Sequence, residues 1–322
     1  MTTLVTGGAG YIGIPLSEEL LDSGRTVRVL DSLVHGQEDL VADLSARGAE
    51  VLVGDVRDPA ARAAALSGVD EVVHLAAIVG DPACAADPDG SREINVEATL
   101  ALVHDAQAAG VGRLVFASTC SNYGRMADPS VPITEEGELA PVSRYAEQKV
   151  AVEEHLLHSD LGSLGATCVR FATVYGVAPR MRFDLTVNEF TRDLWAGRRL
   201  DVFGEQFWRP YVHVRDAARG VRLVLDRSSR EVAGQVFNVG HSDENYRKLD
   251  IVEAIRKTVT DGEVAYVERT EDPRDYKVSF ERIHRELGYV PVMTVPDGVT
   301  ELVAALDDGR FPDPWARRYR NT

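Results

Sequence analysis

The chain has 322 residues, of which 44% are hydrophobic and 27% charged, a composition typical of a globular protein with a buried core. The formal net charge of −16 disfavours a nucleic-acid partner, although a local cluster of arginines can still attract a small anionic ligand. No apolar run approaches the roughly 18 residues that span a bilayer, so we expect no membrane segment.

Short apolar strands alternate with helical patterns through the first half of the chain. The predicted strands are residues 3–6, 26–30, 51–53, 71–75, 113–117 and 167–171. Helical patterns between them include residues 11–22, 95–109 and 144–157. This alternation favours an α/β fold with a doubly wound parallel sheet, the Rossmann arrangement, with helices on both faces.

The regular alternation ends after Gly176. Residues 178–184 are rich in Arg and Pro and are predicted to form a loop, which a helix to about residue 196 follows. Further on, residues 216–225 and 249–259 have helical patterns and residues 236–238 a strand pattern. We therefore predict a smaller α+β part that packs against the sheet as a cap.

Glycines stand between the first strand and the first helix, from Gly7 to Gly13, with G-x-x-G-x-x-G spacing. Such glycines allow a tight turn and a close approach to a pyrophosphate, though they also serve ordinary turns. Asp31 ends the second strand, 18 residues beyond Gly13. If it is more than a turn residue, its carboxylate accepts hydrogen bonds from the adenosine ribose and repels a 2′-phosphate, which favours NAD over NADP. Asp55 and Val56 are expected beside the adenine.

Tyr145 and Lys149 are four residues apart on one face of the predicted helix 144–157. A lysine ammonium in that position is able to lower the pKa of the tyrosine and to bind a cofactor ribose. The phenol then serves as an acid or base near neutral pH. Ser118 and Thr119 supply hydroxyls at the end of the fifth strand. A plain surface pair has the same spacing, so the position after the fifth strand is what favours catalysis.

Several stretches together carry a family resemblance. They are residues 7–13, 74–77, 118–124, 170–176 and 209–216, with Asn95, Tyr145 and Lys149. The chain resembles extended short-chain dehydrogenases/reductases of the NAD-dependent nucleotide-sugar epimerase/dehydratase family. The resemblance implies NAD as cofactor, a nucleotide-diphosphate sugar as substrate, and a homodimer formed through helices 95–109 and 144–157.

The resemblance also implies roles for individual residues. Thr119 and Tyr145 would share the substrate proton, with Lys149 as the third catalytic residue. Expected cofactor contacts are Gly7, Gly10, Tyr11, Ile12, Gly13, Asp31, Asp55, Val56, Leu75, Ala76, Ala77, Asn95, Tyr145, Lys149, Phe171 and Val174, of which Asn95 is more often a structural brace. Expected substrate contacts are Val79, Thr119, Cys120, Thr173, Arg180, Arg182, Asn188, Arg209 and Arg274. For the arginines, salt bridges or solvated surface positions are the alternative. No metal site is expected.

The family mechanism oxidises the sugar at C4 through the tyrosine. A 4-epimerase is the favoured interpretation, and a 4-dehydrogenase that releases the 4-keto sugar is the alternative. A 4,6-dehydratase is disfavoured because Cys120 and Ser121 replace the Asp–Glu pair that elimination uses. Thr173 replaces an Asn of many 4-epimerases, and residues 76–84, 180–188 and 271–276 resemble a subgroup that includes 4-dehydrogenases. A catalytically silent NAD-binding protein is less favoured, since all three catalytic residues are present.

The division into domains follows from the same resemblance. We expect an NAD-binding domain of residues 1–176 plus about 211–240, and a substrate domain of about 177–210 plus 241–322. The three cysteines show no paired spacing, which suits a reducing compartment, and we expect a cytoplasmic location. His213 is predicted to be structural, and residues 317–320 to be a solvated tail.

Overall fold

The computed structural model describes residues 1–126, 128, 130–268 and 274–321. Within them, seven parallel strands form the main sheet in the order β10-β6-β5-β4-β1-β2-β3. The strands are β1 (Thr2–Thr6), β2 (Thr26–Asp31), β3 (Glu50–Val53), β4 (Glu71–His74), β5 (Arg113–Thr119), β6 (Gly165–Phe171) and β10 (Gln235–Val239). The predicted doubly wound parallel sheet is therefore confirmed.

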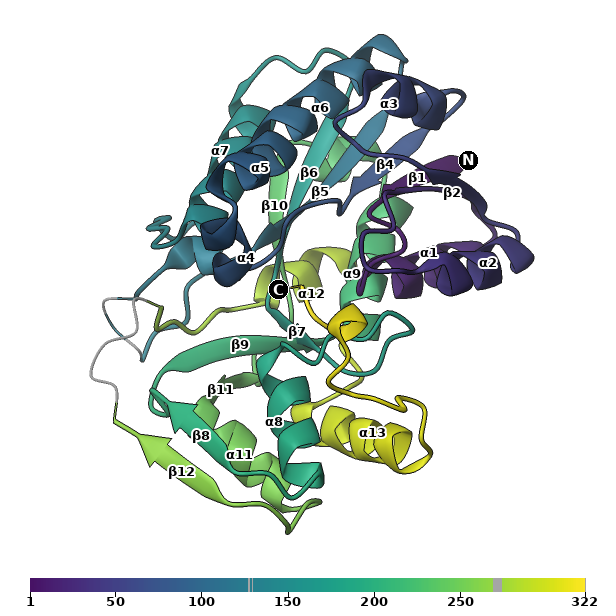
Figure 1. Cartoon of the computed structure of the whole chain (residues 1–322). Helices are drawn as coiled ribbons and strands as arrows, with labels where there is room; N and C mark the ends of the chain where they lie inside the picture. The colour runs from purple at the N-terminus through teal and green to yellow at the C-terminus, as the bar shows by residue number, and fades with distance from the viewer. Residues whose placement is uncertain (127, 129, 269–273, 322) are drawn as a thin grey trace.

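Helices cover both faces of this sheet (Figure 1). One face packs on α3 (Pro59–Leu66), α6 (Thr99–Ala108) and α7 (Arg144–His158), and the other on α1 (Gly13–Asp22) and α9 (Val214–Asp226). The neighbouring residues Leu4 and Val5 of β1 are both fully buried, each in the core of a different face. A strand buried on both faces is almost wholly apolar, which explains the short hydrophobic runs of the sequence.

Two smaller sheets form within the described part of the chain and lie in the lower half of Figure 1. They pair β11 (Asn245–Arg247), β9 (Trp208–His213) and β7 (Thr173–Tyr175), and β12 (Val264–Val267) with β8 (Leu200–Phe203). Helices α8 (Thr186–Trp195), α11 (Lys248–Arg256) and α13 (Val295–Asp307) share one apolar core with them. The exact domain limits given above stay a prediction.

Shorter elements complete the chain. They are α2 (Glu38–Ala46), α4 (Asp81–Ala86), α5 (Pro88–Arg92), the π-helical turn η1 (Glu93–Ala98), the 3-10 turns η2 (Cys120–Tyr123) and η3 (Arg317–Tyr319), α10 (Ser229–Val232) and α12 (Glu281–Leu287). The predicted helix 95–109 thus begins as a π-helical turn and continues as α6. Within η1, Asn95 is turned toward the chain after β4, where it accepts from the Ile78 amide at 2.8 Å.

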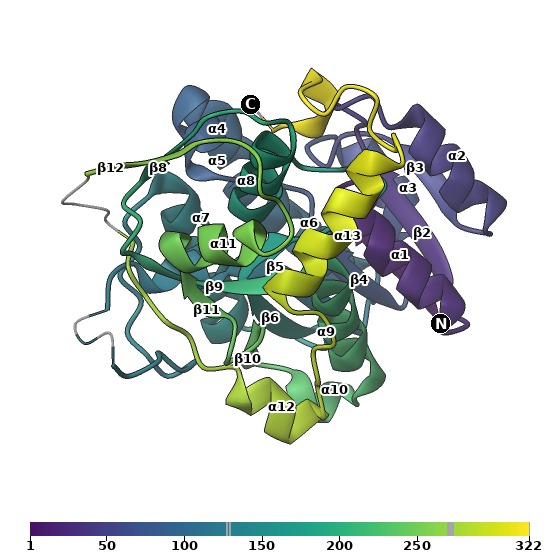
Figure 2. The same cartoon turned by 90° about the horizontal axis from the view of Figure 1, so that it is seen from below.

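The expected solvated tail at residues 317–320 is wrong. The Tyr319 ring packs edge-on against Phe183 and Phe311, at 5.8 and 5.6 Å between ring centres, and Arg318 forms an ion pair with Asp39 of α2 at 3.1 Å. The yellow segment beyond α13 accordingly turns back, and in Figure 1 it ends in front of the middle of the molecule, which Figure 2 shows from below as the upper edge. The charged residues around Tyr319 led to the prediction of a solvated tail, but the ring of Tyr319 anchors the segment.

His213 is structural, as predicted. Its side chain is fully buried, and its Nε2 lies 2.9 Å from a carboxylate oxygen of Glu301 on α13. The same carboxylate accepts from the amide of Val177 at 3.1 Å. Glu301 of α13 therefore joins His213, at the end of β9, to the loop that follows β7.

Candidate functional site

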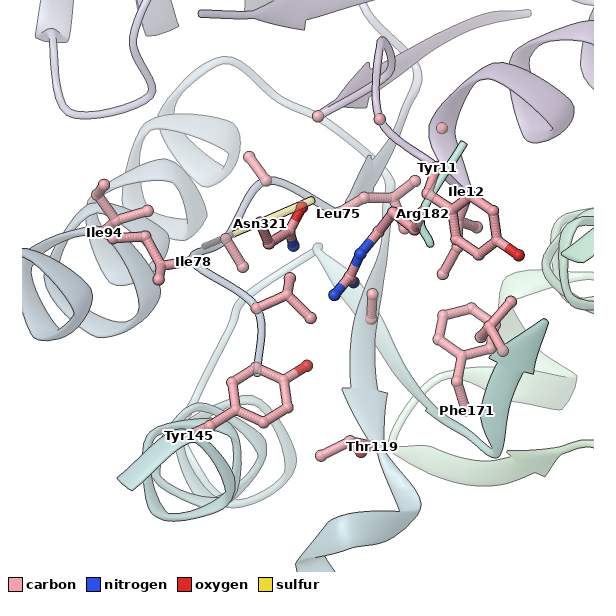
Figure 3. A pocket seen from close by; sticks show the side chains of 18 of the residues that line it. Tyr11, Ile12, Leu75, Ile78, Ile94, Thr119, Tyr145, Phe171, Arg182 and Asn321 are labelled. Atoms are coloured by element: carbon pink, nitrogen blue, oxygen red, sulfur yellow. The ribbon is translucent and has the colours of Figure 1, made fainter. Parts of the chain in front are cut away.

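A cavity of about 520 Å³ opens at the carboxyl ends of the parallel strands, which is where α/β folds bind ligands. Its walls come from the glycine turn after β1, the ends of β2 to β6, the first turns of α7 and the loop after β7. These segments are far apart in the sequence, and only the sheet brings them together. Figure 3 shows the side chains of part of the residues that line the cavity.

Gly7 and Gly13 of the glycine turn have no room for a side chain. Gly7 has a φ of +71°, and a Cβ on it would lie 2.7 Å from the backbone nitrogen of Ala76. A Cβ on Gly13 would lie 2.2 Å from the carbonyl oxygen of Gly7. Helix α1 begins at Gly13 and carries no acidic side chain in its first turn. The turn therefore exposes backbone and a positive helix end to the cavity, which suits a pyrophosphate.

The carboxylate of Asp31 is hydrogen-bonded to this turn. Its Oδ2 accepts from the Ala9 amide at 3.0 Å and its Oδ1 from the Leu33 amide at 2.9 Å. Burial raises the pKa of Asp31, and these two hydrogen bonds and the charge of Arg180 oppose that rise. The carboxylate thus has a fixed orientation at the cavity wall. A bare backbone cradle and an oriented carboxylate fit the pyrophosphate and ribose of a dinucleotide.

The three predicted catalytic residues lie on one side of the cavity. Ser143 caps the start of α7 by accepting from the Ala146 amide, and the helix then presents Tyr145 and Lys149 on one face. In Figure 3 the Tyr145 hydroxyl points into the cavity, with Thr119 nearby. Lys149 Nζ lies 5.9 Å from the centre of the Tyr145 ring. The structure thus brings together the side chains that the sequence placed on separate elements.

The pKa of Tyr145 differs from the expectation. We expected Lys149 to lower it, but the removal of the phenol from bulk water raises it. The charge of Arg182 acts in the opposite direction and is the leading cause that lowers the pKa of Tyr145. The desolvation of a phenolate outweighs the attraction of nearby cations here. Lys149 itself is buried, and burial lowers its pKa to about 8.

Most of the predicted cofactor contacts line the cavity. They are Gly7, Gly10, Tyr11, Ile12, Gly13, Asp31, Asp55, Val56, Leu75, Ala76, Ala77, Tyr145, Lys149, Phe171 and Val174. Asn95 does not line it. Its amide nitrogen donates to the Ile78 carbonyl at 2.9 Å and to Gln148 Oε1 at 2.8 Å, so it braces the chain after β4 against α7.

The predicted substrate contacts divide into two groups. Val79, Thr119, Thr173, Arg180, Arg182 and Arg274 line the cavity, and Cys120, Asn188 and Arg209 do not. Cys120 is buried against the Arg170 carbonyl, which lies 3.3 Å from its sulfur, and burial raises the pKa of its thiol well above the usual value. The side chain packs as a small apolar group, and a contact with substrate stays a prediction.

Asn188 and Arg209 lie behind the cavity wall. Asn188 accepts from the Gly176 amide at 3.0 Å and donates to the Tyr11 hydroxyl at 3.1 Å, so it positions a cavity residue from outside. Arg209 donates to the Trp208 carbonyl at 2.6 Å and lies 5.4 Å from the centre of the Tyr276 ring. For both residues a direct contact with substrate stays a prediction.

The cavity also contains side chains that were not predicted as site residues. Ser121 and Tyr276 line it with their hydroxyl oxygens 3.2 Å apart. Tyr276 stands directly after Arg274 and Asp275 in a stretch already singled out, of which residues 271–273 lie outside the described residues. Asn321 lines the cavity as well. No local pattern predicts Asn321, because its position depends on the path of the whole C-terminal segment.

The described residues contain neither a membrane-spanning helix nor a cluster of metal ligands. No helix in residues 1–126, 130–268 or 274–321 has both the length and the apolar character needed to cross a membrane. In the same part of the chain, no group of three or more His, Cys, Asp or Glu side chains is placed to hold a metal ion. The homodimer and the cytoplasmic location stay predictions.

Comparison with known proteins places the chain among well-described enzymes. A model of the NAD dependent epimerase/dehydratase family matches residues 3–240. The UDP-glucose 4-epimerase of Lacticaseibacillus casei is 31% identical over 316 residues, which cover 90% of this chain and 92% of that protein. The dTDP-glucose 4,6-dehydratase of Streptomyces griseus is 32% identical over 320 residues, 94% of each chain.

A solved structure agrees over nearly the same length. The dTDP-glucose 4,6-dehydratase of Streptomyces venezuelae, solved with NAD bound, superposes with a TM-score of 0.85 at 29% identity. The match covers 98% of this chain and 99% of that one. Both the large sheet and the smaller part therefore have counterparts in that protein.

Proposed function

The chain belongs to the NAD-dependent epimerase/dehydratase family, and we propose that it oxidises C4 of a nucleotide-linked sugar, with 4-epimerisation as the overall reaction. Its cofactor is NAD. The observation that carries the proposal is that the Tyr145 hydroxyl points into the same cavity that the glycine turn and Asp31 line (Figure 3). An acid–base group thus shares one enclosed space with a dinucleotide cradle.

In the proposed reaction, Tyr145 as phenolate takes the proton of the C4 hydroxyl while a hydride leaves C4, so that C4 becomes a ketone. NAD, when bound, accepts that hydride and returns it. Thr119 hydrogen-bonds the same sugar oxygen and holds it beside Tyr145. When the hydride returns to the opposite face of C4, Tyr145 gives the proton back, and the configuration at C4 is inverted.

Positive side chains have to stabilise the phenolate, because burial raises the pKa of Tyr145. Lys149 lies 5.9 Å from the ring centre and cannot turn away, since its Nζ donates to the Ala117 carbonyl at 2.8 Å. The charge of Arg182 lowers the pKa of Tyr145. These two cations support the acid–base role that the proposal gives to Tyr145.

A 4,6-dehydratase activity is not proposed, although relatives of that activity are similar to the chain. Elimination of water needs an acid and a base next to the residue at position 119. Cys120 is buried and its thiol has a raised pKa. The Ser121 hydroxyl oxygen lies 3.2 Å from the Tyr276 hydroxyl oxygen, so the two form a hydrogen bond. Neither side chain suits proton transfer at C5 or O6.

The test uses the purified protein with UDP-, dTDP- and GDP-linked hexoses. An epimerase converts the sugar without lasting absorbance at 340 nm, and a product analysis by NMR shows inversion at C4. Accumulation of NADH with a released 4-keto sugar would instead establish the 4-dehydrogenase and overturn epimerisation.

A variant tests the role of the tyrosine. We expect Tyr145→Phe to lower turnover about 10²- to 10⁴-fold, as loss of a general acid–base does. Tyr266→Phe is the matched control, because that tyrosine is 46% exposed in β12. Full activity of Tyr145→Phe would overturn the mechanism.

A further inference from the structure

One wall of the cavity is made by two segments that meet from distant parts of the chain. Residues 180–184 follow β7, and residues 318–321, here called the C-terminal strap, lie near the end of the chain. Arg180 Nη2 donates to the Arg320 carbonyl at 3.1 Å and to Asn321 Oδ1 at 2.8 Å. The Asn321 amide in turn donates to Asp184 Oδ2 at 3.2 Å. Arg180, Arg182 and Asn321 all line the cavity.

The strap is held along its length. The Phe183 amide donates to the Tyr319 carbonyl at 2.9 Å, and the Tyr319 ring packs edge-on against Phe183. Arg318 pairs with Asp39 at 3.1 Å, so the strap also reaches α2. The chain just before α2 contributes further cavity residues, among them His35. The strap therefore joins the loop after β7 to the edge of the sheet that carries Asp31.

Arg180 has a donor that the chain leaves unused. The residue is only 4% exposed, and within the described part of the chain its buried Nε has no hydrogen-bond partner. Buried guanidinium donors are nearly always paired, because an unmade hydrogen bond at a charged group is costly. The strap holds Nη2, and although Nε is shielded from solvent, the Arg180 side chain as a whole lines the cavity, where its guanidinium can meet an acceptor of a ligand.

The surroundings of Arg180 indicate which ligand supplies that acceptor. Its charge lowers the pKa of Asp31, the carboxylate at the dinucleotide cradle, and the carboxylates of Asp31 and Asp184 in turn act on Arg180. Arg182 differs, because Asp184 holds its guanidinium by two hydrogen bonds of 3.0 and 2.7 Å. In Figure 3, Arg182 points into the middle of the cavity, toward the side of Tyr145. Arg180 is thus assigned to the end of the cavity that holds Asp31 and the glycine turn, and Arg182 to the centre of the cavity.

We propose that the Arg180 guanidinium donates a hydrogen bond to the ribose–phosphate part of the bound dinucleotide, and that the C-terminal strap holds Arg180 in place and slows the release of NAD. This moves Arg180 from the expected substrate contacts to the cofactor site. The proposal rests on the cofactor part of the proposed function and does not depend on which sugar is oxidised. Slow release suits an enzyme that returns each hydride to the same substrate.

The experiment measures NAD binding without any sugar, by calorimetry and by the rate of NAD release from the loaded protein. We expect Arg180→Met to bind NAD about 10- to 100-fold more weakly, the usual effect of losing a hydrogen bond to a charged group. Asn321→Ala should release NAD several-fold faster, since it removes only an acceptor that positions Arg180. Arg317→Ala is the matched control from the neighbouring exposed position and should leave both quantities unchanged.

A second set of measurements distinguishes whether Arg180 binds the dinucleotide or the nucleoside diphosphate of the substrate. The binding of UDP, dTDP and GDP to the NAD-loaded protein is measured for the same variants. The proposal predicts that Arg180→Met keeps its affinity for the nucleoside diphosphate within about twofold. Loss of nucleoside diphosphate binding with unchanged NAD binding would assign Arg180 to the substrate and overturn the proposal, as would an equal loss of both.

Folding of the variants is checked by circular dichroism and thermal melting. If Arg180→Met does not fold, Arg180→Lys and Asn321→Ala carry the test, because both keep a positive charge at position 180. Unchanged NAD binding and release in these two variants would overturn the proposal. Turnover plays no part in these measurements, so their result stays separate from that of Tyr145→Phe.

Discussion

Lys149 and Ala117 connect the catalytic helix to the strand that ends at the site. Lys149 Nζ donates to the Ala117 carbonyl at 2.8 Å, although the lysine is only 3% exposed. The bond fixes α7 against β5 two residues before Thr119. A buried ammonium is kept in this position at a cost in stability, and that cost depends on pH.

Lys149→Met should therefore change how stability varies with pH. Burial lowers the pKa of Lys149 to about 8, from 10.5, so the unfolded chain binds more protons between these values. The cost of the buried charge is present below pH 8 and disappears as the pH rises to 10.5. The difference in unfolding free energy between Lys149→Met and the wild type should therefore be larger, in favour of the variant, at pH 7 than at pH 10.5, by up to about 3 kcal/mol.

Urea unfolding of the NAD-free protein at both pH values measures this difference. Lys257→Met, at an exposed position of the chain after α11, is the control and should show no such change with pH. An equal effect of Lys149→Met at both values would show that the buried lysine has an ordinary pKa.

Asp31→Asn should weaken the preference for NAD. The substitution keeps an oxygen for the Ala9 or Leu33 amide, and it removes the charge that would repel a 2′-phosphate. We expect the ratio of the NADP and NAD dissociation constants to fall at least about tenfold, which corresponds to about 1.4 kcal/mol. Asp55→Asn is the control in the same cavity, because Asp55 already pairs with Arg57 at 2.6 Å. An unchanged ratio in Asp31→Asn would remove Asp31 from cofactor selection.

Gly13→Ala should disturb the glycine turn. The added Cβ would lie 2.2 Å from the Gly7 carbonyl oxygen, a backbone atom that cannot move aside alone. We expect a loss of stability of about 1–3 kcal/mol, as in other overpacked sites, together with weaker NAD binding. Gly112→Ala is the control, since its Cβ would have no atom closer than 3.8 Å. Thermal melting and calorimetry measure the two effects, and normal NAD binding by Gly13→Ala would contradict the cradle.

Glu153→Gln should destabilise the protein strongly. Glu153 lies under the site on α7, where Arg170 Nη2 donates to it at 2.6 Å and Asn122 Nδ2 at 3.0 Å. Removing one charge leaves the buried guanidinium of Arg170 without its counter-ion, which typically costs about 3–5 kcal/mol. The exposed neighbour Glu154 provides the control, and Glu154→Gln should change the free energy of unfolding by less than about 0.5 kcal/mol. A small effect of Glu153→Gln in urea unfolding would show that the pair is dispensable.

The sequence by itself determined the main sheet, the glycine turn and the tyrosine–lysine pair. Each of these follows from a local pattern: apolar runs for strands buried on both faces, glycines where no Cβ fits, and a spacing of four on one helix face. Their physical causes act within a few residues, so they can be predicted before any contact is known. The Thr294–Asp297 capping box that begins α13 is a local signal of the same kind.

The tertiary structure alone decided which predicted residues reach the cavity and in which direction their pKa values shift. Arg180 donates a hydrogen bond to Asn321, which is 141 positions away in the sequence, and no local pattern predicts a contact over that separation. Asn95 and Asn188 do not line the cavity, and they form hydrogen bonds with residues of other elements. The pKa of Tyr145 is raised because many groups together exclude water from the phenol, and that sum exists only in the folded chain.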